Sequence, residues 1–64
     1  MPVHEPECEY CDRLAEWRVC AQWTLADWDW IDACFRHVRV AWRELELRTV
    51  DGFPVQEMYT QRWP

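Results

Sequence analysis

The strongest constraint in the sequence is a set of four residues that pair at short spacing. Cys8 and Cys11 form a Cys-x2-Cys pair near the start, and Cys34 and His37 form a Cys-x2-His pair in the middle. Three thiolates and one imidazole complete the tetrahedral shell that Zn²⁺ adopts in structural sites. We therefore predict a structural zinc site, with Zn²⁺ as the cofactor.

A chain of this length needs such a site. Its 64 residues bury only about 60% of their unfolded surface, and domains this small depend on a metal, on disulfides or on a partner chain. We expect one zinc-binding domain over residues 1–64. It comprises an N-terminal loop (1–7), a core (8–48), and a C-terminal strand and tail (49–64).

The charge balance restricts the partners. Twelve Asp and Glu outnumber seven basic residues, all of them Arg, and the formal net charge is −5. An acidic chain is a poor match for nucleic acid or an anionic membrane. No apolar run approaches the roughly 18 residues of a membrane span, and the N-terminal stretch does not resemble a signal peptide. We expect a cytoplasmic protein, whose thiols stay reduced and available to a metal.

Two stretches between the cysteine pairs alternate between apolar and polar side chains, which is typical of β-strands. Along residues 15–23, one face is apolar and consists of Ala15, Trp17, Val19, Ala21 and Trp23. Residues 28–32 alternate again, with Trp28 and Trp30 on one side. We expect an antiparallel hairpin whose buried face brings the four tryptophans of these stretches together as cross-strand neighbours.

From about Ala33 the apolar residues recur at helical spacing. This apolar stripe consists of Phe35, Val38, Ala41, Trp42 and Leu45. Asp32 stands just ahead of it and is a candidate N-cap. The spacing therefore predicts a helix that carries Cys34 and His37 on one face of its first turn and that ends before the Asp-Gly pair at 51–52.

The C-terminal part predicts a short strand over residues 53–60, which its proline restricts to a sheet edge or to the start of the strand. An alternative is a helix that ends earlier, so that residues 45–50 pair with this strand as a hairpin across the Asp-Gly turn. We expect residues 61–64 to form a loose tail unless Trp63 docks.

A zinc knuckle, a β-hairpin and an α-helix follow one another in the order of a treble-clef zinc finger. The chain resembles the small treble-clef zinc-binding proteins common in high-GC bacteria and their phages. The residues that carry the resemblance are 8–11, 14–19 and 33–37. It covers about residues 8–45, and it departs from the pattern where Asp12 and Arg13 stand in place of a glycine. The resemblance implies a small, zinc-stabilised α+β fold of treble-clef type and little about activity.

Other assignments of these residues stay open. Reduced core cysteines and an ordinary surface histidine are the simplest alternative to a metal site. Cys20 or His4 is a candidate replacement for a member of the ligand set. A redox role for the first cysteine pair requires a thioredoxin-like context, which the sequence lacks.

The outer side of the predicted helix is a candidate contact surface. It carries five residues, namely Arg36, Arg39, Val40, Arg43 and Leu47. Such a side is commonly an ordinary solvated face, but arginine beside aliphatic anchors is also typical of interfaces. A partner would be another protein, or a second copy of the chain related by a twofold axis.

These features favour a non-enzymatic zinc-binding domain that acts through protein–protein contacts. The first alternative is a nucleic-acid-binding zinc finger that uses the helix arginines and exposed tryptophans, which the net charge disfavours. The second is a metal-dependent hydrolase or nuclease. Four protein ligands leave no open metal position for water, so we expect no enzyme activity and no small-molecule substrate.

Overall fold

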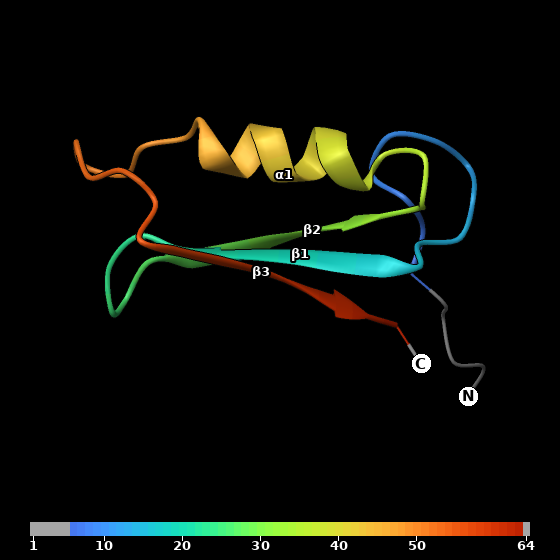
Figure 1. Cartoon of the computed structure of the whole chain (residues 1–64), viewed down its shortest axis with the longest axis horizontal. Coiled ribbons are helices and arrows are strands. Elements are labelled where there is room, and N and C mark those ends of the chain that lie inside the picture. Colours follow the sequence, from blue (N-terminus) through green and yellow to red (C-terminus); the bar gives the residue numbers. More distant parts are fainter. Residues whose placement is uncertain (1–5, 64) are drawn as a thin grey trace.

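The computed structural model describes residues 6–63 as an antiparallel sheet with a helix lying across one of its faces (Figure 1). Within this range, the elements run in the order β1 (Trp17–Gln22), β2 (Trp28–Ala33), α1 (Val38–Glu46) and β3 (Glu57–Arg62). The strand order in the sheet is β2-β1-β3. The coarse prediction of a small α+β fold is confirmed. Most of the predicted N-terminal loop, at residues 1–5, lies outside the described part of the chain.

The hairpin predicted between the two cysteine pairs is present as β1 and β2. Its register places Val19 opposite Ile31 and Cys20 opposite Trp30. The connection lacks the usual Asn-Gly or Asp-Gly signal and is held by a side chain, because the Thr24 hydroxyl accepts the backbone N–H of Asp27 at 3.1 Å. A threonine that bonds the backbone ahead of it supplies the turn.

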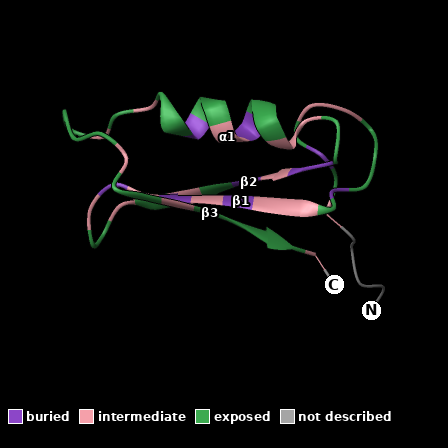
Figure 2. Cartoon of the chain, viewed as in Figure 1, coloured by how far each residue is buried: buried purple, intermediate pink, exposed green. Residues whose placement is uncertain are grey.

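The core lies between the sheet and α1, which packs on β1 and β2 (Figure 2). The predicted apolar face of residues 15–23 is correct, since Val19, Ala21 and Trp23 are all buried. On the helix, Ala41 and Leu45 are fully buried. The alanines of both layers let the helix approach the sheet closely, so a nine-residue helix contacts two strands.

The predicted cluster of four tryptophans is wrong. Trp28 and Trp30 are 61% and 39% exposed and lie on the sheet face away from α1, while Ile31 and Ala33 of the same strand are buried. A period of two assigns residues to two faces but does not say which face meets the core. Here the smaller side chains of β2 fit under the helix, and the indoles take the other side.

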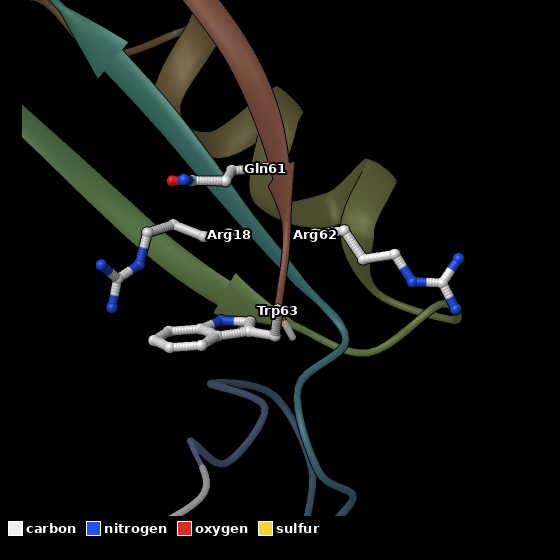
Figure 3. A pocket seen from close by; sticks show the side chains of 4 residues that line it. All are labelled: Arg18, Gln61, Arg62 and Trp63. Atoms are coloured by element: carbon white, nitrogen blue, oxygen red, sulfur yellow. The ribbon is translucent and has the colours of Figure 1, made fainter.

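On the sheet face away from α1, which we call the open face, four side chains form a stack. Trp28 and Trp30 stack with ring centroids 5.1 Å apart, and the Arg18 guanidinium lies 4.8 Å from the Trp30 ring and 4.4 Å from the Trp63 ring. Figure 3 shows Arg18 and Trp63 on this side and Arg62 pointing to the other. We refer to Trp28, Trp30, Arg18 and Trp63 as the Trp–Arg stack.

Asp32 fixes one end of the Trp–Arg stack. Its Oδ1 accepts hydrogen bonds from Arg18 Nε and from Trp63 Nε1, each at 3.0 Å. The backbone N–H of Trp63 also donates to the carbonyl of Glu16 at 2.9 Å. The tail is therefore docked at Trp63, and Asp32 is a strand residue that holds Arg18 and Trp63 in the stack. Its prediction as a helix N-cap is wrong.

The helix begins later than its periodicity indicated. Ala33 belongs to β2, where it pairs with Trp17, and α1 starts at Val38. Cys34 and His37 are consequently not in the first turn of the helix. They lie in a turn closed by the His37 N–H and the Cys34 carbonyl at 3.0 Å. Phe35 sits in this turn and is 56% exposed, so its prediction as part of the core stripe is wrong.

The segment after the helix contains a tight turn but no hairpin. Asp51 and Gly52 have φ values of 51° and 82°, the backbone of a two-residue type I′ turn, in which glycine is the residue without strain. Its only ladder contact is a bridge between Val50 and Phe53. The alternative that pairs residues 45–50 with the terminal strand is therefore wrong. The terminal strand itself is present as β3, shifted to Glu57–Arg62 and paired with β1 at the sheet edge.

Two leucines two residues apart in the chain test this packing. Leu45 is 0% exposed and Leu47 is 72% exposed. In the zinc-loaded protein, we expect Leu45→Ala to lower the free energy of unfolding by about 2–5 kcal/mol, because it leaves a cavity between α1 and the sheet. Leu47→Ala, the matched control, should stay within about 0.5 kcal/mol of wild type. Urea denaturation followed by circular dichroism measures both, and equal effects would contradict the described core.

Candidate metal centre

The four predicted ligands come from three different parts of the fold. Cys8 and Cys11 lie on the loop before β1, Cys34 directly follows β2, and His37 directly precedes α1. The loop is closed by the Cys8 N–H, which donates to the Arg13 carbonyl at 2.8 Å. Ala33 is the last paired residue of β2, so its pairing fixes the position of Cys34 at the end of the strand. The turn that follows brings His37 close to Cys34.

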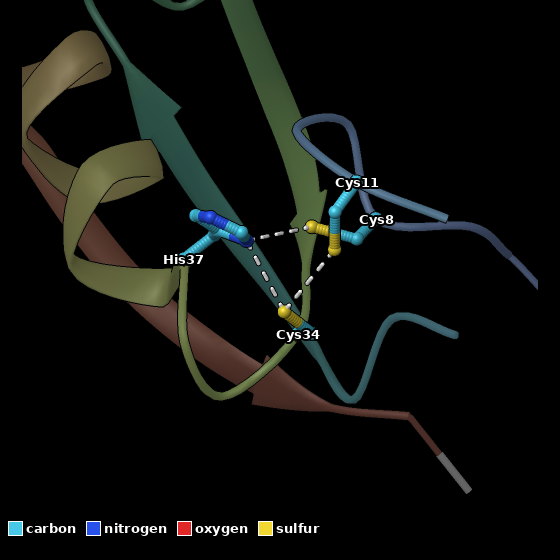
Figure 4. Close-up of side chains that lie close together, drawn as sticks. All are labelled: Cys8, Cys11, Cys34 and His37. Atoms are coloured by element: carbon cyan, nitrogen blue, oxygen red, sulfur yellow. Dashed lines mark hydrogen bonds between the residues drawn. The ribbon is translucent and has the colours of Figure 1, made fainter. Parts of the chain in front are cut away.

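The four candidate ligand atoms lie close together, and the distances among them approach those of a tetrahedral zinc shell. They all lie within 4.8 Å of one another. His37 Nδ1 is 3.3 Å from Cys34 Sγ and 3.6 Å from Cys8 Sγ, and the Cys11 and Cys34 sulfurs are 3.7 Å apart (Figure 4). Zn–S and Zn–N bonds at a tetrahedral angle give S···S and S···N edges of about 3.8 and 3.6 Å. The spacing therefore fits a Cys3His zinc site.

The sulfur atoms sit in an environment that favours one thiolate. Burial raises the pKa of the Cys8 thiol, but hydrogen bonds from the backbone N–H groups of Cys34 and Tyr10 and from the neighbouring thiols lower it to about 6. The pKa of Cys11 is raised: the Arg13 backbone lowers it, but desolvation and the neighbouring sulfurs outweigh that effect. Packed thiols resist ionising together, whereas a bound divalent cation stabilises three thiolates at once.

A tyrosine braces the site from the side of the helix. The Tyr10 ring packs against the His37 ring with centroids 5.7 Å apart, and its hydroxyl donates a hydrogen bond to the Glu44 carboxylate of α1. Burial and the Glu44 charge raise the pKa of Tyr10, so the hydroxyl remains a donor. Tyr10 was not among the residues predicted for the site. The sequence feature that could have indicated its role is its position between the two cysteines of the knuckle.

The alternative ligands do not join this group. Cys20 lies on the open face, beside Tyr59 of β3, and His4 lies outside the described residues. Within residues 6–63, the Cys3His cluster is the group of side chains that could hold a metal ion such as zinc. Its donors number four, three thiolates and one imidazole, which is the pattern of a structural site.

The predicted contact residues are on the surface, on the side of the molecule away from the sheet. Arg39, Val40 and Arg43 lie on α1, Arg36 precedes it, and Leu47 follows it. All five are exposed, with Val40 at 47% and Leu47 at 72%. The Arg36 guanidinium lies 5.7 Å from the Phe35 ring. We refer to these five residues as the helix strip.

Comparison with protein-family models, with curated proteins and with solved structures finds no match for this chain. No helix within residues 6–63 has the length and apolar character needed to cross a membrane.

A pair of cysteine variants tests the ligand set. Wild type and Cys20→Ser should each bind one equivalent of Zn²⁺, because the Cys20 thiol lies outside the cluster. Cys34→Ser removes a fully buried sulfur and should weaken zinc binding by about 100-fold or more, since even indirect ligand contacts change affinity by about 10–100-fold. Competition with a chromophoric chelator measures the affinities. Loss of zinc from Cys20→Ser alone would reassign the site.

Proposed function

We propose that this chain is a zinc-stabilised domain of treble-clef type that acts through protein–protein contacts and is not an enzyme. The observation that carries the proposal is the convergence of three thiols and one imidazole, from the knuckle and from the turn between β2 and α1, within 4.8 Å. A structural zinc holds separate segments of a small domain together at one point.

The treble-clef assignment is supported by where each ligand pair stands relative to the hairpin. Cys8 and Cys11 precede β1, while Cys34 and His37 stand between β2 and α1. In a treble clef, one pair comes from a knuckle and the other from the first turn of the helix; here Cys34 and His37 lie in the turn directly before α1. The third strand, β3, adds to the free side of β1 and extends this arrangement.

The absence of catalysis is proposed from the donor set. A catalytic zinc keeps three protein ligands and one position for water or substrate. Here four donors fit one tetrahedron, so a bound Zn²⁺ has no position left for a reacting group. Reduced cysteines are a requirement of this site, and we propose the cytoplasm as its compartment.

The helix strip is the surface that we propose for the contacts. Within residues 6–63, the ion pairs are those of Arg18 with Asp32 and of Arg48 with Asp29, so the arginines of the strip are available to carboxylates of another molecule. Arg39, Arg43 and Leu47 border a surface groove together with Trp42 and Glu46. Arginine and apolar anchors around a groove favour a protein partner or a second copy of the chain.

Metal removal tests the structural role. Zinc affinity at such sites corresponds to about 10–16 kcal/mol, which is as large as the whole free energy of unfolding of a typical domain, about 5–15 kcal/mol. We therefore expect a strong chelator to abolish near-ultraviolet circular dichroism, and added Zn²⁺ to restore it. Magnesium, the control ion, should restore nothing. Full tertiary structure in the chelated protein would contradict a structural zinc.

A surface variant tests the contact role. Arg39→Gln/Arg43→Gln/Leu47→Ala should reduce complex formation by at least about tenfold, since arginine and apolar anchors carry much of the affinity at interfaces. Arg13→Gln/Arg62→Gln/Leu25→Ala changes the same residue types at other exposed positions and should have no effect. Sedimentation velocity over a concentration series measures self-association, and chemical cross-linking in cells measures partners. A wild-type chain that stays monomeric and captures nothing would refute the contact role.

A further inference from the structure

The Trp–Arg stack on the open face has one unfilled end. Trp28, Trp30 and Asp32 are alternate residues of β2 and lie on the same face, and the register places Arg18 opposite Asp32. Trp30 therefore has Trp28 on one side and Arg18 on the other, and Arg18 lies between Trp30 and Trp63. Trp28 is different, because Trp30 is its only stacking partner in the described chain and 61% of its surface is exposed.

The interior of the stack shows which group fits a tryptophan face here. The Arg18 guanidinium lies within 5 Å of both indoles that flank it, at 4.8 and 4.4 Å. These distances are well within the roughly 6 Å range of a cation–π contact. A guanidinium is planar and weakly hydrated and stacks flat on an aromatic ring, whereas a lysine ammonium remains strongly hydrated. The next layer beyond Trp28 therefore fits another guanidinium.

The charges around Trp28 favour the same occupant. Gln22 of β1 lies opposite both Trp28 of β2 and Glu57 of β3, so these three side chains form one row across the open face. This row carries a carboxylate and no basic residue. Arg18, two rows away, is paired with Asp32. In a chain of net charge −5, this end of the sheet attracts cations and repels phosphates.

We propose that the outer face of Trp28, together with Gln22 and Glu57, binds an arginine side chain of a basic segment on a partner protein. The guanidinium would stack on the indole, extend the stack by one layer and lie within reach of the Glu57 carboxylate. This site is on the sheet face opposite α1 and goes beyond the contacts proposed for the helix strip. The domain thus offers an acidic-aromatic surface on one side and an arginine-bearing surface on the other.

The test uses the zinc-loaded full chain and two synthetic peptides, one of alternating Arg and Gly and one in which every Arg is Lys. At low salt, we expect the Arg peptide to bind about fivefold more tightly than the Lys peptide. Trp28→Ala should weaken Arg-peptide binding about tenfold, and Glu57→Gln by a smaller factor of about three. Trp28→Phe should retain part of the affinity. Shifts of indole N–H signals in NMR titrations measure each constant.

Leu14→Ala is the matched control, because Leu14 is 54% exposed on the loop before β1 and outside the row; it should bind like wild type. Unchanged zinc content and circular dichroism show that Trp28→Ala is folded. If the Arg and Lys peptides bind equally well, or if Trp28→Ala binds the Arg peptide like wild type, the binding depends on net charge alone. Either result would overturn the proposal.

Two further outcomes would replace the occupant. If the chain self-associates and Trp28→Ala abolishes that self-association, the occupant is a second copy of the chain. If single-stranded oligothymidine binds more tightly than the Arg peptide does and its binding depends on Trp28, the occupant is a nucleic acid. The helix-strip variant Arg39→Gln/Arg43→Gln/Leu47→Ala should keep full affinity for the Arg peptide, so the two surface proposals can fail separately.

Discussion

The meeting of three sulfurs and one imidazole nitrogen within 4.8 Å is the contact on which the rest of this fold depends. An isolated helix of nine residues is too short to be stable in water. Here His37 fastens its N-terminal end, and the buried Ala41 and Leu45 hold it to the sheet. The loop before β1 contains no helix or strand, and it is attached through the cysteines, through the Glu9 N–H bonded to the Asp32 carbonyl and through the Tyr10 hydroxyl bonded to Glu44. A metal bound at this point would connect these segments.

Local patterns in the sequence predicted the Cys3His cluster, the hairpin and the buried face of β1. Each follows from short-range information, namely cysteine spacing or a period of two. The same information could not place the start of α1. Ala33 reads equally well as helix or strand, and its pairing with Trp17 across the sheet decides for strand. The sequence also could not tell on which face of the sheet Trp28 and Trp30 lie. That depends on which face of β2 packs against α1, and local patterns do not give the position of the helix.

Docking of Trp63 is the clearest case of a contact beyond sequence reasoning. Its partners, Arg18 and Asp32, are distant in sequence and come together only when β3 adds to the free side of β1. The open face thereby gains cover from its own side chains, since an antiparallel sheet with one layer above it exposes the other side to water. Several tryptophans in a small chain are accommodated in this way without a second hydrophobic core.

Asp32 ties both ends of the described chain to one place. Its backbone carbonyl accepts the Glu9 N–H at 2.9 Å, and its carboxylate holds Trp63 at 3.0 Å. The described chain therefore begins and ends at one corner, next to the Cys3His cluster, with the hairpin tip at the opposite end of the sheet (Figure 1). Pulling on the two ends would load Asp32 and the neighbouring ligands directly and leave the hairpin tip without tension.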